Sequence, residues 1–230
     1  MGKTASGNET LSDLEAALYN TLKEILGKNV VFYFNAEFID LCCRKVRAPE
    51  LDVYKALYSL IYQKFIVPGT SLTRERVLEN PTRKHILTSL KNSPGIHIRG
   101  LCSALNKRIG VILAHLEVLE TFGFIRSKKF SPFKPTLLFL KEFPDTYDAF
   151  FLITKNQNAL NILRLLTNLQ LTVTELSSRI QVHHSTIQYH LDRLERLDLV
   201  IRMVGDHITK FTFNKSKLEF FTKFSELYLK

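Results

Sequence analysis

Glycine is scarce in this chain, and no common catalytic motif is present. Nine glycines in 230 residues leave little material for a loop that cradles phosphate with its backbone N–H groups. The glycine-rich nucleotide-binding motifs, the HExxH motif of zinc proteases and the GxSxG motif of hydrolases are all absent from the sequence. We therefore expect no enzymatic activity, no catalytic residues and no cofactor.

Cysteine is also scarce, and its spacing excludes two classes of small protein. The three cysteines are the adjacent pair Cys42 and Cys43 and the distant Cys102. Without a CxxC pair, neither a zinc ribbon nor a disulfide framework is indicated. We expect three small apolar side chains in a reducing, cytoplasmic environment and no metal site.

Long apolar runs are missing. None approaches the roughly 18–20 residues that a membrane span needs, so we expect no membrane partner. The first ten residues are polar and lack the apolar centre of a signal peptide. We interpret residues 1–11 as a flexible tail.

Basic residues, in contrast, are plentiful. The net charge is +10 and the isoelectric point is near 9.5. Residues 77–147 carry eleven basic and five acidic side chains, whereas residues 1–76 carry ten and nine. The excess of positive charge favours an anionic partner such as nucleic acid.

Two segments of the chain, 98–125 and 173–200, align without a gap at an offset of 75. A repeat of this length predicts one supersecondary unit used twice. Each copy has the pattern of a helix, a short turn, a second helix and a strand, which predicts a helix-turn-helix followed by a wing. The identical pairs are Leu101/Leu176, Ser103/Ser178, Ile112/Ile187, His115/His190, Leu116/Leu191, Leu119/Leu194 and Glu120/Glu195.

A weaker third copy precedes these two. Leu57, Leu60 and Ile66 match Leu116, Leu119 and Ile125 at an offset of 59, with strands expected at 30–34 and 65–67. The predicted fold class is mainly α with small β wings (α+β), as tandem winged helix-turn-helix domains. We name the predicted domains module 1 (12–76), module 2 (77–145) and module 3 (146–214), followed by an amphipathic helix at 215–230.

Capping signals set the expected helix starts. Ser12 with Glu15, and Asn80 with Pro81, predict the first helices of modules 1 and 2. In module 3, we expect a linker at 143–148, a first helix at 155–168, and second and third helices capped by Thr174 and by Ser185 with Gln188.

Three stretches resemble archaeal tandem winged-helix regulators of the broad ArsR/MarR-like superfamily. They are NPTRKHILTSLKNSPGIHIRGLCSALN, LAHLEVLETFGFIRS and YHLDRLERLDLV, and the resemblance covers about 80–230 well and 30–80 loosely. The resemblance implies a DNA-binding transcription regulator. At position 114 an alanine stands where Tyr189 supplies an aromatic ring in module 3, and Lys107-Arg108-Ile109-Gly110 lacks the usual capping Ser or Thr.

The first half of the third helix in each module is the segment that would enter the major groove. In module 3 it is polar, and we predict that it reads base edges. The candidate base-reading residues are His183, His184, Ser185, Thr186, Gln188, Tyr189 and Arg193. The candidate phosphate-binding residues are Lys107, Arg108, Lys128, Lys129, Lys134 and Lys210.

Module 1 has a different character. Its corresponding helix begins with Glu50 and Asp52, which would repel phosphate, so we expect a dimerisation or protein-partner module. The final helix carries an apolar stripe that either packs back on module 3 or pairs with a second copy in a homodimer. The stripe consists of Leu218, Phe221, Phe224 and Leu227.

Two functions remain open from the sequence. The first is sequence-dependent binding of double-stranded DNA by a transcription regulator or nucleoid protein. The alternative is a scaffold of tandem winged helices that assembles proteins, as in ESCRT-II, without binding DNA.

Overall fold

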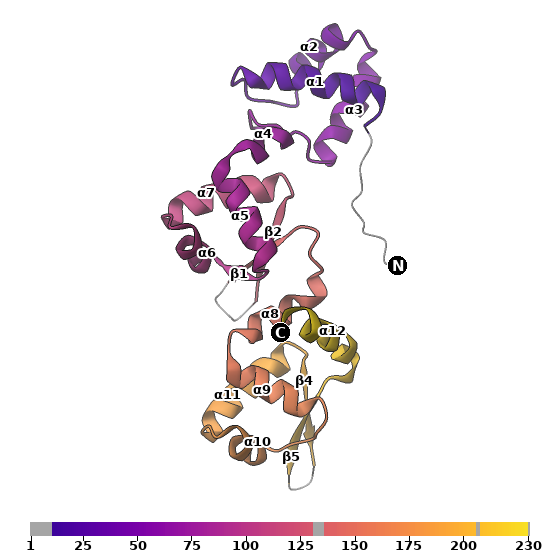
Figure 1. Ribbon diagram of the computed structural model, residues 1–230. Coiled ribbons are helices and arrows are strands. Elements are labelled where there is room, and N and C mark those ends of the chain that lie inside the picture. The colour runs from indigo at the N-terminus through magenta and orange to yellow at the C-terminus, as the bar shows by residue number, and fades with distance from the viewer. Residues whose placement is uncertain (1–10, 131–135, 206–207, 230) are drawn as a thin grey trace. The chain divides into compact units, whose positions relative to one another are not determined.

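The computed structural model describes residues 11–130, 136–205 and 208–229 (Figure 1). The chain divides into two compact units, Met1–Lys141 and Glu142–Lys230, called here the N-terminal unit and the C-terminal unit. The described residues form helices together with a three-stranded sheet, in the order β1-β3-β2, and a two-stranded sheet, β4-β5. The predicted fold class, mainly helical with small β wings, is confirmed.

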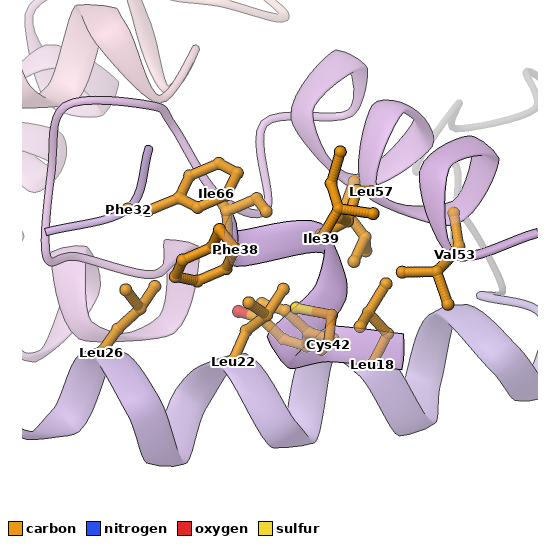
Figure 2. Packing of buried hydrophobic residues seen from close by; sticks show 13 residues of the cluster. Leu18, Leu22, Leu26, Phe32, Phe38, Ile39, Cys42, Val53, Leu57 and Ile66 are labelled. Atoms are coloured by element: carbon orange, nitrogen blue, oxygen red, sulfur yellow. The ribbon is translucent and has the colours of Figure 1, made fainter. Parts of the chain in front are cut away.

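Module 1 consists of three helices, α1 (Asp13–Gly27), α2 (Ala36–Val46) and α3 (Glu50–Tyr62). The predicted cap of α1 is confirmed: Ser12 and Glu15 form a reciprocal capping box. Figure 2 shows the core, where Leu18, Cys42 and Leu57 from the three helices meet and are fully buried. Apolar residues at helical spacing on each helix bury one face against the other two helices.

The predictions of strands at 30–34 and 65–67 are wrong. Within residues 11–76 the backbone forms no ladder; Phe32 N–H donates to the Thr70 carbonyl at 2.9 Å, and Ile66 makes a single β-bridge with Thr73. A turn through Pro68 and Gly69, with Gly69 at φ +81°, ends the extended segment at once, and Thr73 already caps the next helix. The β-pairing within the described part of module 1 is thus one isolated bridge.

Helix α4 (Arg74–Glu79) was not predicted. It supplies arginines to the carboxyl ends of other helices, where carbonyls lack intrahelical partners. Arg74 Nη1 lies 3.3 Å from the carbonyls of Gln63 and Phe122, the residues that cap α3 and α7. Arg76 Nη1 donates to the Leu26 carbonyl at the end of α1, at 3.0 Å. The bond from Arg74 to Phe122 connects module 1 to module 2 inside the N-terminal unit, and the other two hold α4 to the helices of module 1.

Module 2 has the element order of a winged helix. Its elements are α5 (Pro81–Asn92), β1 (Ile96–His97), α6 (Ile98–Leu105), α7 (Ile109–Thr121), β2 (Ile125–Lys129) and β3 (Thr136–Leu140). Asn80 caps α5 and Pro81 is its first residue, as predicted. Strand β3 pairs with both β1 and β2 in antiparallel fashion.

The C-terminal unit has the same order of three helices and two strands, between added helices at both ends, with an isolated bridge between Leu171 and Phe211 where module 2 has β1. Its elements are η1 (Asp145–Tyr147), α8 (Asp148–Thr154), α9 (Gln157–Leu166), α10 (Val173–Ile180), α11 (His184–Arg196), β4 (Val200–Val204), β5 (Thr209–Phe213), η2 (Lys215–Lys217) and α12 (Leu218–Tyr228). Helix α8 was not predicted. Asn156 caps α9, so the helix expected at 155–168 begins later and ends earlier.

Two predicted caps in module 3 are wrong. Thr172, not Thr174, caps α10 and forms a capping box with Glu175. His183, not Ser185, caps α11. The residue just outside each helix has the extended backbone that a cap requires, whereas Thr174 and Ser185 already lie in the first helical turn.

Helix α12 packs on its own unit, and two residues of the predicted apolar stripe are buried there. Phe221 and Phe224 are 5% and 0% exposed. Phe224 meets the rings of Phe150 and Phe151 at centroid distances of 5.2 and 4.9 Å. Of the two alternatives for the stripe, packing on module 3 or pairing with a second copy, the structure has the first for these two phenylalanines, which lie in the core of one chain, so they are not available as dimer contacts; Leu218 and Leu227 stay exposed.

Candidate nucleic-acid interface

Helices α10 and α11 form a helix-turn-helix. Gln181 ends α10 in the left-handed conformation, with φ 61° and ψ 43°, and two residues later His183 caps the next helix. Ile187, Leu191 and Leu194 of α11 are fully buried. These three residues fix the rotation of α11, so that its opposite face points to solvent.

That outward face carries polar side chains in the first turns of α11. His183, His184 and Ser185 are exposed, and Tyr189 is 59% exposed. The Nδ1 atom of His183 accepts from the Ser185 backbone N–H at 3.3 Å and lies 2.8 Å from the Ser185 Oγ. The structure thus places these predicted base-reading residues together at the amino end of one helix, with Thr186 partly buried beside them.

Gln188 belongs to a polar network that the sequence did not reveal. Its Nε2 donates to Asp192 Oδ1 at 2.6 Å, one turn along the helix, so the predicted capping box with Ser185 is not formed. Arg202 of strand β4 donates to the same Asp192 oxygen at 3.0 Å and to Glu195 Oε2 at 2.9 Å. The sequence did offer one signal for this network: Asp192 and Glu195 are three positions apart on a predicted helix, and Arg202 lies on the strand that follows. The network ties the orientation of Gln188 to the wing.

Arg193 lies elsewhere. Its side chain is partly buried and its Nη2 lies 3.5 Å from the carbonyl oxygen of Leu152 in α8. Of the seven predicted base-reading residues, Arg193 is the one that the structure directs toward α8 and not toward the exposed first turns of α11.

Basic side chains flank the helix-turn-helix. Lys210 on β5 and Arg179 at the end of α10 are exposed. Both contribute to lowering the pKa of Glu175, after the larger effect of the hydrogen bonds from the Thr172 backbone and side chain. Lys210 therefore lies near Glu175 in the first turn of α10.

The other predicted phosphate ligands lie in module 2. Lys107 and Arg108 are exposed directly before α7, and Lys128 and Lys129 are exposed on β2. Lys134 lies outside the described residues. These residues belong to the N-terminal unit, whereas α11 belongs to the C-terminal unit, and each set is a separate candidate surface.

The two histidines at equivalent positions are His115, which is partly buried, and His190, which is buried. Burial, followed by the charge of Arg193, lowers the pKa of His190. Burial, followed by the charges of Arg83 and Lys107, lowers the pKa of His115. Over the part of the chain that the structure describes, no three His, Cys, Asp or Glu side chains gather as a metal site would require. Nor does any helix of that part have the length and apolar character needed to cross a membrane.

A paired α10 and α11 with a polar outward face and a following β-hairpin define a winged helix-turn-helix domain. Residues 156–203 match the family described as a helix-turn-helix domain. This match begins at the cap of α9 and ends in β4, so it covers the helices and the first wing strand of module 3.

The chain is also similar to an uncharacterized HTH-type transcriptional regulator of Methanocaldococcus jannaschii, MJ1398. The two are 30% identical over 171 residues, which is 74% of this chain and 42% of that protein. The chain thus spans less than half of the relative's length. The predicted resemblance to archaeal helix-turn-helix regulators is confirmed by the domain match and by this relative.

Two solved structures are similar in part. Reduced HlyU from Vibrio cholerae N16961 is 26% identical, over 37% of this chain and 90% of that chain, with a TM-score of 0.33. ScpB from Mycobacterium tuberculosis is 15% identical, over 65% of this chain and 97% of that chain, with a TM-score of 0.25.

Proposed function

We propose that this chain is a double-stranded DNA-binding transcription regulator or nucleoid protein, not an enzyme, in which α11 reads base edges in the major groove. The observation that carries the proposal is the exposed polar face at the amino end of α11, fixed in rotation by Ile187, Leu191 and Leu194. The helix-turn-helix match over 156–203 and the regulator name of the archaeal relative support it.

The side chains on this face suit base recognition. A Gln amide can bond adenine through two hydrogen bonds, and Ser or His can bond a base or a phosphate. The bond from Gln188 Nε2 to Asp192 holds the amide at one orientation and leaves its second N–H and its carbonyl for a base. In this proposal Lys210 neutralises a phosphate beside α11, and the lysines of module 2 add affinity that is independent of sequence.

We extend the proposal to a tandem arrangement of three winged helices, modules 1 to 3. The bounds of α6, α7 and β2 coincide with those of α10, α11 and β4 after a shift of 75 residues. Helix α3 coincides with α7 after a shift of 59. The shared element order supports three copies, of which module 3 is the DNA reader.

Binding of the full chain to mixed duplex DNA, titrated at several salt concentrations, tests the proposal. We expect a dissociation constant on the order of micromolar or tighter at low salt, weakening steeply as salt rises because counterions are released from the phosphates. Replacing Lys128 and Lys129 by Ala should make the logarithmic salt slope shallower by roughly one per lost phosphate contact. Absence of binding at low salt would contradict the proposal.

A second candidate function, a protein-binding scaffold, is supported by module 1. Helix α3 exposes Leu51, Tyr54, Tyr58 and Tyr62, at 63%, 45%, 59% and 78%. Exposed tyrosines are typical of protein interfaces. Replacing Tyr58 and Tyr62 by Ser should leave DNA binding unchanged if module 1 serves as a partner module of a DNA-binding protein. A chain that never binds duplex DNA but captures a protein through this face would favour the scaffold.

A further inference from the structure

Helix α7 exposes apolar side chains where a DNA-reading helix would expose polar ones. Ile109, Val111 and Leu113 are 52%, 44% and 46% exposed. Gly110 and Ala114 lie between them and are exposed as well. These five residues, called here the α7 face, occupy the first turns of the helix, the segment that enters the groove in a helix-turn-helix.

The buried residues of α7 fix which side of the helix faces solvent, so no other side could be turned toward DNA. Ile112 and Leu119 are fully buried and Leu116 is 5% exposed, so these residues cannot turn outward without emptying the core. No side chain of the α7 face has a nitrogen or an oxygen, so the face cannot bond the donors and acceptors of base edges. The next outward residue, Glu117, is exposed and would repel phosphate.

Small residues mark the centre of this face. A side chain at Gly110 would meet nothing within 4 Å inside the chain, so the chain's own packing does not require glycine there. Glycine weakens a helix relative to alanine. Gly110 and Ala114 are one turn apart, flanked by larger apolar side chains, and such a surface lets a second helix approach closely.

The charges along α7 are self-complementary. Lys107 and Arg108 precede its first turn, and Glu117 and Glu120 lie in its second half. Lys107 and Glu117 are ten residues apart, about 15 Å along the axis, too far to pair within one chain. Helix α7 also begins without a side-chain cap, and the positive end of its dipole attracts a carboxylate.

We infer that the α7 face is a self-association surface on which the α7 helices of two copies of this chain pack antiparallel, with the two-fold axis level with Ile112, midway between Gly110 and Ala114. In this arrangement Glu117 of one copy lies beside Lys107 and the uncapped start of α7 in the other, and the same contact recurs by symmetry. The apolar side chains are removed from water, which supplies the driving force. The pairing requires no DNA. Lys107, a candidate phosphate ligand in the proposed function, pairs here with Glu117, so the dimer is tested in the absence of DNA.

Sedimentation velocity of the full chain without DNA, over a wide concentration series, tests this inference. We expect a monomer–dimer equilibrium for the unchanged protein and a monomer for Ala114→Arg, because the arginine side chain would fill the space opposite Gly110 of the other copy, where the two helices approach closely. The matched control is Ala104→Arg, which makes the same change at an exposed position of α6 and should leave the dimer intact. Circular dichroism checks that both variants are folded.

A charge exchange tests the antiparallel geometry. Lys107→Glu and Glu117→Lys should each weaken the dimer by roughly tenfold or more, since like charges then face each other twice across the axis. The double variant should restore the dimer, because the contact is re-formed with its sign reversed. A monomeric unchanged protein, a dimer that survives Ala114→Arg, equal loss in Ala104→Arg, or failure of the double variant to recover would each overturn the inference.

Discussion

Helices α7 and α11 have equivalent places in two series of elements whose bounds match, and their sequences differ mainly on the outward side. Their bounds coincide after a shift of 75 residues. The inward residues match: Ile112 and Ile187 are both fully buried. The outward residues do not, since Leu113 stands where α11 has Gln188. At these equivalent positions the residues that hold the fold are alike, whereas the exposed residues, which do not affect the core, differ in chemistry.

The connection from this helix to the wing shows the same division. Glu120 of α7 accepts from Ser127 Oγ of β2 at 2.8 Å, and at the equivalent positions Glu195 of α11 accepts from Arg202 of β4. The geometry of a helix carboxylate bonded to the first wing strand is retained. In module 3 the larger Arg202 side chain also reaches Asp192, which extends the link to Gln188 on the outward face of α11.

The inward face should respond identically in the two copies. Ile112→Ala and Ile187→Ala should each lower the free energy of unfolding by about 2–5 kcal/mol, because each empties a fully buried site. Urea denaturation, monitored by circular dichroism, measures both. If only one of the two substitutions lowers the free energy of unfolding, the equivalent buried positions do not contribute equally to stability.

The outward face should respond differently. Gln188→Ala should lose about 1–3 kcal/mol of discrimination at one base pair if its amide bonds a base through two contacts. Leu113→Ala, the equivalent change in α7, should leave DNA discrimination unchanged. Binding competition among duplexes that differ at single positions measures both variants. Equal effects would remove the functional distinction between the helices.

Much of this comparison was readable from the sequence, because apolar spacing and the repeat specify the inward positions directly. The helix-turn-helix of module 3, the caps at Ser12 and Asn80 and the exposed amino end of α11 followed from local patterns. Features that depend on contacts distant in sequence did not. Nothing local shows that Phe224 would pack on Phe150 or that Arg202 would reach two carboxylates on α11.

Sequence patterns also misplaced features where two local signals competed. Both Thr172 and Thr174 can cap a helix, and the choice depends on which one has an acidic residue three positions later in the chain; Thr172 has Glu175. At 65–67 the apolar run predicted a strand, yet the turn at Gly69 left room for one bridge. Turn geometry overrode strand propensity there.

The equivalent histidines offer a test by pH. Burial, and then Arg193, lowers the pKa of His190 from its ordinary 6.5, so the folded chain resists a proton that the unfolded chain binds. Stability is complete above about pH 6.5 and falls as the pH drops below that value. His115 is less buried than His190, although its pKa is lowered in the same direction.

We therefore expect acid to destabilise the chain, and His190→Gln to flatten this pH dependence more than His115→Gln does. Thermal unfolding of both variants between about pH 5 and 7.5 measures the difference, which cannot exceed about 1.4 kcal/mol per unit of pKa shift. A pH dependence that survives in both variants would assign it to other groups.

The smallest effect on the free energy of unfolding is expected at the contact of Arg202 with Asp192 and Glu195, where we also expect an effect on DNA discrimination. Arg202 and its partners Asp192 and Glu195 are 35–44% exposed in their side chains, so Arg202→Ala should cost only about 0.2–1 kcal/mol of unfolding free energy. Because the freed Asp192 no longer holds Gln188 in one orientation, discrimination between DNA sequences should fall more than stability does. Ser127→Ala, the equivalent change in module 2, should leave discrimination unaltered. If Arg202→Ala binds all duplexes with unchanged selectivity, the network supports the wing alone and Gln188 is oriented by the helix itself.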